Sequence, residues 1–150
     1  MIYTTKLTNI KQYDNILKHL GKFKNRLLSR ATKTNWWQLQ QSQLEYMPSF
    51  ESPKIIYEDI ANKPKFSLDL EKRYIANSAY FLKSDDLFLL SLLNSNLIKW
   101  FIYLTSRVYR GGFSTYSNVY VEKIPIKEPS LEIKKKLIVK VSKIIELTKN

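Results

Sequence analysis

One apolar run constrains this sequence more than any other feature: residues 87–104 are rich in Leu, Ile, Phe and Trp. The run could be a membrane span, but it contains Ser91, Asn94, Ser95, Asn96 and Lys99. A lysine near the centre of a span costs roughly 2.5–3.5 kcal/mol, and the asparagines add to that cost. We therefore expect no membrane span but a buried central helix pair, broken at Asn94-Ser95, that the rest of the chain covers.

The second of these helices is expected to run from about residue 96 to 106 and to lead into a loop with two arginines and a Gly-Gly pair. Arg107 and Arg110 are of the type that contacts phosphates and binds guanine bidentately. Gly111 and Gly112 allow positive φ and a close approach of the backbone. Surface charge, or an ion pair at a helix end, is the alternative for the two arginines.

The remaining side chains of this loop are less specific. Ser114 and Tyr116 are expected to approach base edges together with the arginines. Tyr109 and Phe113 are more simply packing residues. The sequence therefore predicts that the loop binds DNA.

The charge balance points the same way. The 150 residues carry 25 Lys or Arg and 13 Asp or Glu, a net charge of +12, and such a field favours polyanions. A basic protein from a lysine-rich genome is the alternative. The chain has no cysteine, which excludes disulfides and thiol chemistry and fits a cytoplasmic protein.

Catalytic motifs are missing from the sequence. Three glycines form no phosphate-binding loop, and one histidine without cysteine leaves few nucleophile–base pairs. His19 is expected to be an ordinary helix residue. A metal nuclease built on Asp59, Glu132 and Lys134 is a weak alternative, because acid-x-lysine spacing is common by chance here. We expect no catalysis by this chain itself and no metal site.

The N-terminal part predicts one long helix over residues 9–30, with Asn9 as N-cap and an apolar face at helical spacing. Lys33, Trp36 and Trp37 follow. Lys33 and Trp36 are candidate DNA contacts, with Trp36 as a stacking or wedge residue. Alternatively both tryptophans fill the junction between the helix and the next segment.

The middle part predicts a small, mostly antiparallel sheet, with strands at residues 54–58, 65–70, 73–76 and 79–82. Lys63, Lys65 and Arg73 lie on its turns and strand ends and are candidate DNA contacts. Ser84 is expected to cap the next helix, with Asp85 and Asp86 in its first turn.

The C-terminal part, residues 130–150, predicts an amphipathic helix that packs on the domain or on a partner. We expect residues 1–129 to form the recognition domain and this helix to be an addition to it. The apolar faces of the terminal helices also allow self-association.

Several motifs occur in a characteristic order. They are a basic helix with Asn35-Trp-Trp-Gln-Leu, then Lys54-Ile-Ile-Tyr-Glu-Asp-Ile-Ala-Asn-Lys-Pro-Lys-Phe-Ser-Leu-Asp, Asn77-Ser-Ala-Tyr-Phe-Leu, Leu92-Leu-Asn-Ser-Asn-Leu, Tyr109-Arg-Gly-Gly and Glu122-Lys-Ile-Pro-Ile. From about residue 10 to 145 the chain resembles the TaqI-like C-terminal specificity domain of type II restriction–modification enzymes and their adenine methyltransferases. The later motifs also resemble the target-recognition domains of type I specificity subunits.

The resemblance implies an α+β target-recognition domain that recognises a short sequence in double-stranded DNA. Methylation and cleavage, with S-adenosylmethionine and Mg²⁺, would belong to a methyltransferase or endonuclease catalytic domain or subunit outside these residues. An excised domain, a truncated frame and a stand-alone subunit all fit this expectation. A non-enzymatic interaction scaffold, or a specificity subunit of the type I kind, is the alternative, and the target sequence stays open.

Overall fold

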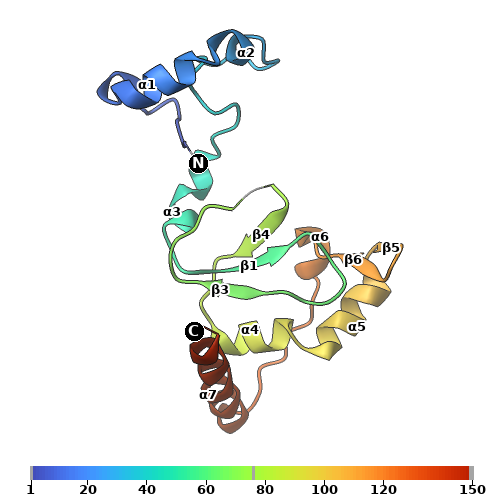
Figure 1. Cartoon of the computed structure of the whole chain (residues 1–150). Helices are drawn as coiled ribbons and strands as arrows, with labels where there is room; N and C mark the ends of the chain where they lie inside the picture. The colour runs from blue at the N-terminus through green and yellow to red at the C-terminus, as the bar shows by residue number, and fades with distance from the viewer. Residues whose placement is uncertain (1, 76, 149–150) are drawn as a thin grey trace. The chain divides into compact units, whose positions relative to one another are not determined.

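The computed structural model describes residues 2–75 and 77–148 (Figure 1). The chain forms two compact units, Met1–Met47 and Pro48–Asn150, and the short helix α3 (Met47–Phe50) contains the boundary. Both sheets and the longest helix, α7, belong to the second unit. The assignment of DNA recognition to residues 1–129 stays a prediction.

The N-terminal unit is built from short helices: η1 (Ile10–Gln12), α1 (Asp14–Gly21), α2 (Lys24–Leu28) and η2 (Leu44–Tyr46). The predicted single helix over residues 9–30 is therefore wrong. Asn9 makes no side-chain cap, and the backbone leaves the helical region at Tyr13 (ψ 62°) and Phe23 (ψ 9°). Gly21, which has low helix propensity, ends α1 just before the second break.

Arg30 ties the end of α2 to the segment that follows it. Its guanidinium donates hydrogen bonds to the carbonyl oxygens of Leu27 (2.8 Å), Gln38 (2.9 Å) and Trp36 (3.1 Å). The Thr4 hydroxyl donates to the Trp37 carbonyl at 2.5 Å, so the irregular segment that contains Thr4 also holds the residues after α2 in place. Three charge-assisted hydrogen bonds explain why this arginine is half-buried in a unit with few buried side chains.

The second unit contains two antiparallel sheets. The first has the order β3 (Ser67–Asp69), β1 (Lys54–Glu58), β4 (Ala79–Leu82), and the second has the order β2 (Ile60–Ala61), β6 (Phe113–Thr115), β5 (Val108–Tyr109). The α+β class and three of the predicted strands are confirmed, whereas the second sheet was not predicted. Strand β2 follows β1 after one residue, so the chain passes directly from one sheet to the other.

The predicted strand over residues 73–76 is wrong for residues 73–75, and Ala76 lies outside the described residues. Asp69 explains the difference. Its carboxylate accepts the backbone N–H groups of Glu71 (3.0 Å) and Arg73 (2.8 Å), which removes donors that a strand would need. Lys72, between them, has φ +56°.

The helix pair α4 (Leu87–Leu93) and α5 (Asn96–Thr105) confirms the predicted break. Asn94 bonds the backbone of Phe66 through both side-chain atoms (2.9 and 3.1 Å), and Ser95 caps α5 by accepting the N–H of Ile98. The pair is only partly buried, because α5 has an exposed outer face. Within the described residues no single helix is long and apolar enough to cross a membrane; α4 and α5 meet that test only as a pair, bent by 58°.

The N-cap of α4 is Asp86, not Ser84 as predicted. The Asp86 carboxylate accepts the N–H of Phe88 (2.8 Å) and Leu89 (3.4 Å), while the Ser84 hydroxyl accepts the N–H of Asp86 (3.2 Å). The carboxylate is the better partner for the positive end of the helix dipole. The chain therefore enters the helix two residues later than expected.

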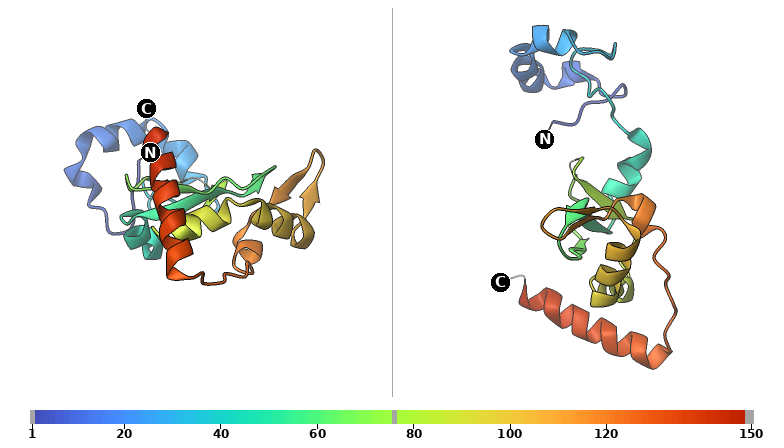
Figure 2. Two further views of the ribbon diagram at one scale, coloured as in Figure 1. Left: turned by 90° about the horizontal axis from the view of Figure 1, so that it is seen from below. Right: turned by 90° about the vertical axis from the view of Figure 1, so that its right-hand side faces the viewer.

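The core lies between β1 and the inner faces of α4 and α5. Its most buried apolar side chains are Ile55, Leu93, Ile98 and Ile102. The short helix α6 (Asn118–Val121) contributes Val121, and α7 (Leu131–Leu147) packs on α4 (Figures 1 and 2). The C-terminal helix therefore covers the domain, one of the two positions considered for it.

A buried ion pair links β1 and β3 of the first sheet. Lys54 Nζ lies 2.7 Å from Asp69 Oδ2, both side chains have no exposed area, and Lys54 also donates to the Phe50 carbonyl at 3.1 Å. Burial alone would raise the pKa of Asp69, but hydrogen bonds from Lys54 and two backbone N–H groups lower it. Asp69 therefore stays ionised beside its partner.

We expect Asp69→Asn to lower the free energy of unfolding by about 3–5 kcal/mol, because it leaves the Lys54 ammonium buried without a counter-charge. Urea denaturation followed by circular dichroism measures the change. The exposed pair Lys65–Glu58, with an N–O distance of 3.0 Å, is the control. Lys65→Met should cost less than about 1 kcal/mol, and equal losses from both variants contradict this account.

The same pair predicts a pH dependence. Because the folded pKa of Asp69 is depressed, its stabilisation is present above its unfolded pKa of about 4 and is lost as pH falls through the lower folded value. Over that acid range Asp69→Asn should lose less stability than the wild-type chain does. Parallel acid titrations of the two proteins measure the difference, and identical slopes contradict it.

Candidate nucleic-acid interface

Asp59 joins the two sheets and fixes the position of β6. Its N–H donates to the Ser78 carbonyl (3.1 Å), and its own carbonyl accepts the N–H of Tyr116 (2.6 Å). Its carboxylate accepts the hydroxyl of Thr115 at 3.0 Å. One residue therefore holds β4, β1 and the end of β6 together, so β6 has a defined place beside α5.

The predicted loop is a β-hairpin, which we call the hairpin: β5, the turn 110–112 and β6. Val108 pairs with Ser114 and Tyr109 with Phe113. Gly111 and Gly112 have φ of +83° and +76°, values that L-residues adopt at a cost, as the Gly-Gly pair predicted. The hairpin lies at one end of the second unit, next to α5 (Figures 1 and 2).

Arg107 and Arg110 lie at the start and the turn of the hairpin, and both side chains are exposed. Neither forms a salt bridge with an acidic side chain in the described part of the chain. Their charges face solvent, so no internal partner competes with a phosphate or a guanine edge. The alternative of a helix-end ion pair finds no support in the described contacts.

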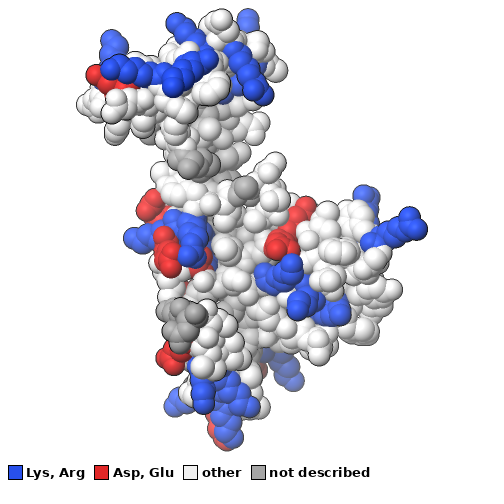
Figure 3. All heavy atoms as spheres, in the orientation of Figure 1, with Lys and Arg blue, Asp and Glu red and all other residues white. Residues whose placement is uncertain are grey.

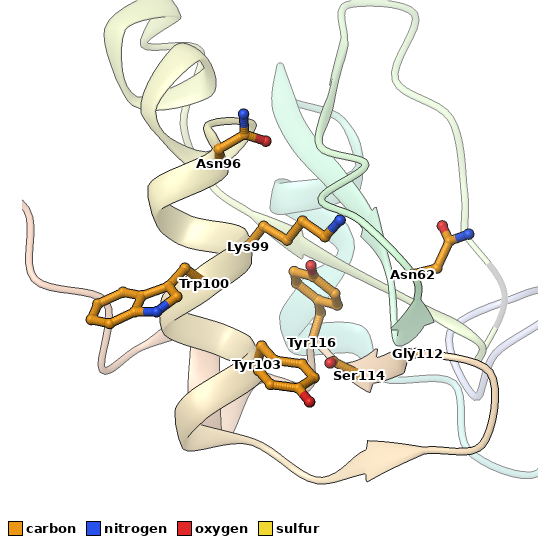
Figure 4. Close-up of a pocket in the computed structure, with 8 residues that line it drawn as sticks. All are labelled: Asn62, Asn96, Lys99, Trp100, Tyr103, Gly112, Ser114 and Tyr116. Atoms are coloured by element: carbon orange, nitrogen blue, oxygen red, sulfur yellow. The ribbon is translucent and has the colours of Figure 1, made fainter.

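A cavity of about 310 Å³ lies between α5 and the hairpin; we call it the α5 cavity (Figure 4). Helix α5 contributes one face at helical spacing, and Asn62 comes from the bend after β2. Lys99 and Tyr103 extend from α5 toward Tyr116 (Figure 4). The lining residues are Asn62, Asn96, Lys99, Trp100, Tyr103, Gly112, Ser114 and Tyr116.

Ser114 and Tyr116 lie two residues apart on and just after β6 and contribute to the lining of this cavity. They are only 5% and 2% exposed. Tyr116 packs edge-on against Phe66, with ring centroids 6.1 Å apart, and burial raises its pKa to about 12. Its hydroxyl therefore keeps its proton at neutral pH and is available as a donor.

Five lining residues were missed by the sequence analysis: Asn62, Asn96, Lys99, Trp100 and Tyr103. Four of them recur at positions i, i+3, i+4 and i+7 of α5, which is the spacing of one helix face. That face is opposite the buried Ile98 and Ile102. A polar–aromatic face on an otherwise apolar helix was the available signal, but the high apolar content of residues 87–104 favoured a buried helix instead.

The other candidate contacts of the second unit, Lys63, Lys65 and Arg73, differ in their surroundings. Lys63 follows Asn62 and is exposed, and Lys65 pairs with Glu58. Arg73 pairs with Glu71 and lies 3.7 Å from Asp69, beside the first sheet. Lys65 and Arg73 thus have internal partners that the sequence did not reveal.

Lys33 and Trp36 belong to the N-terminal unit. Lys33 is exposed, Trp36 is half-buried, and Lys24 Nζ lies 5.5 Å from the centre of the Trp36 ring. This unit carries eight basic and two acidic residues within 47, so it is the more densely basic of the two. On the face shown in Figure 3, Lys and Arg side chains gather along the upper part of this unit.

The residues considered for a metal nuclease have other partners. Asp59 accepts the Thr115 hydroxyl, while Lys134 lies 3.6 Å from both Asp86 and Glu128. In the described residues no group of three or more His, Asp or Glu side chains is arranged to hold a metal ion. Glu132 pairs with Lys136 rather than with Lys134.

Comparison with known protein families shows which family the chain belongs to. Residues 4–126 match the family TaqI_C, the TaqI-like C-terminal specificity domain. The chain belongs to this family. The match begins earlier than the resemblance suggested and ends before α7, so the C-terminal helix lies outside it.

Membership in the TaqI-like specificity family supports a DNA target-recognition role in restriction–modification, as a recognition module rather than a catalytic one. The matched residues include the hairpin, α5 and the N-terminal unit from residue 4 onward. Every residue that lines the α5 cavity lies within the match.

The glycines allow a matched test of hairpin geometry. A Cβ at Gly112 or at Gly21 would meet nothing within 4 Å, but only Gly112 has a positive φ. We expect Gly112→Ala to destabilise the chain by about 1 kcal/mol and Gly21→Ala to stabilise it by about 0.5–1 kcal/mol. Thermal unfolding of both variants measures the signs, and a stabilised Gly112→Ala protein contradicts the hairpin conformation.

Proposed function

We propose that this chain recognises a short sequence in double-stranded DNA and holds the duplex for a separate catalytic domain that methylates or cleaves it. The observation that carries the proposal is the pair Arg107 and Arg110, exposed and without salt bridges in the described residues, on the hairpin beside the α5 cavity. Family membership and the net charge of +12 support it.

Two kinds of DNA contact are expected, one with phosphates and one with base edges. Basic side chains of the N-terminal unit, such as Lys18 and Lys22, are exposed and bind phosphates regardless of sequence. Arg107 and Arg110 approach base edges, where an arginine binds the O6 and N7 atoms of guanine. Affinity would then depend mainly on the first group, and sequence preference on the second.

We propose further that S-adenosylmethionine and Mg²⁺ bind to the catalytic partner and not to this chain. The family match supports a recognition module, and the described residues of the hairpin and of the α5 cavity include no carboxylate that would bind Mg²⁺. The partner would be a methyltransferase or endonuclease domain or subunit that acts on the duplex held here.

An interaction scaffold is the second candidate. It is favoured by exposed apolar side chains on α7, among them Leu131, Val139 and Leu147, each 68% exposed. This candidate predicts self-association and weak DNA binding. Light scattering that finds a monomer with strong, salt-dependent binding to duplex DNA decides against it.

A paired substitution tests the proposal. Selection from a random duplex library gives the preferred sequence, and Arg107→Ala/Arg110→Ala should reduce its preference over random DNA by about tenfold or more. Lys22→Ala/Lys24→Ala should weaken binding to both DNAs equally and reduce the salt dependence. Competition binding at two salt concentrations measures both effects. Equal losses of preference from the two double variants contradict the assignment of the hairpin.

A further inference from the structure

The α5 cavity differs in composition from an ordinary protein-docking pocket. Its walls are formed by three aromatic side chains, Trp100, Tyr103 and Tyr116, and none of the described residues that line it is aliphatic. The groove between β3 and α7, by contrast, is lined largely by aliphatic residues such as Leu68, Leu137 and Val141. These two concave surfaces therefore fit different ligands.

The charged and polar groups of the α5 cavity narrow the ligand class. Among the described residues that line it, Lys99 alone is charged, so an anion or a neutral group is favoured over a cation. Asn62 and Asn96 supply amides, each of which offers both donors and an acceptor, as the edge of a nucleobase requires. Ser114 and Tyr116 add hydroxyl groups at the strand side.

Size and rigidity agree with a ligand of one base. A volume of about 310 Å³ is at the lower end of the range for small-molecule sites. Tyr116 is held by Phe66 and by the hydrogen bond of its N–H to Asp59, and Gly112 leaves the rim open because it lacks a side chain. Unpaired bases are recognised by stacking on aromatic rings and by hydrogen bonds to their edges.

We propose that the α5 cavity binds one unpaired nucleobase of the nucleic acid, with the exposed ring of Tyr103 against one of its faces, the buried Tyr116 at the inner end of the cavity and Lys99 near a flanking phosphate. This inference rests on the proposed function, because it assumes that DNA binds at this end of the second unit. It adds a binding site for a base outside the paired stack, distinct from the arginines that contact paired bases.

The wild-type chain tests the inference without any substitution. The probes are two fluorescent single strands of about twelve nucleotides, one of mixed sequence and one that is abasic throughout. Both carry the same phosphate charge, so only the bases differ. The strand with bases should bind on the order of tenfold more tightly, since stacking one base contributes about 1–3 kcal/mol, and it should quench Trp100 fluorescence. Equal affinities overturn the inference.

Two variants locate the site. Tyr103→Ala should remove the preference for the strand with bases, whereas Leu104→Ala should keep it. These neighbours on α5 are 54% and 59% exposed, but only Tyr103 lines the cavity. Trp100→Ala is a second variant, and circular dichroism confirms that each folds. A preference that survives in both cavity variants overturns the inference.

Paired duplex DNA, measured in parallel, separates the two proposals. Strong and salt-dependent duplex binding with equal binding of the two single strands overturns the base site and leaves the proposed function standing. Absence of duplex binding contradicts the proposed function itself. A gain for unpaired bases together with duplex binding supports both.

Discussion

The arrangement of the second unit depends on the hydrogen bonds of Asp59. This residue lies between β1 and β2, where the chain leaves one sheet for the other, and it bonds to Ser78, Thr115 and Tyr116. Segments far apart in the sequence are thereby held at one junction. The hairpin is short and exposed, and without this junction its position beside α5 would rest on a few strand-pairing hydrogen bonds.

The candidate interface follows from that junction and from the two faces of α5. Ile98 and Ile102 are 2% and 0% exposed and fix the helix on the core, so Lys99 and Tyr103 are directed toward β6. The buried pair Lys54–Asp69 fixes β1 to β3 on the other side of the unit. Elements anchored by buried side chains and hydrogen bonds therefore hold the arginines and the α5 cavity, and a recognition site needs such support.

Local signals in the sequence predicted local features well. The Asn94-Ser95 break, the three strands of the first sheet and the Gly-Gly turn have short-range causes, namely capping, alternation and positive φ. The prediction of one long N-terminal helix was wrong because apolar periodicity does not reveal whether a helix face is buried. Phe23 and Leu28, which belong to the predicted apolar face, are exposed. The second sheet pairs residues 60–61 with 114–115, a long-range contact that alternation cannot predict.

The central claim is that the hairpin and the outer face of α5 contact DNA. Nuclear magnetic resonance of the labelled chain with its selected duplex tests it most directly, because shifts of backbone amides show which residues are affected. We expect the largest shifts at residues 96–103 and 107–116, with smaller shifts over the basic N-terminal unit. Largest shifts on α7 or β3, with the hairpin unaffected, would contradict the account.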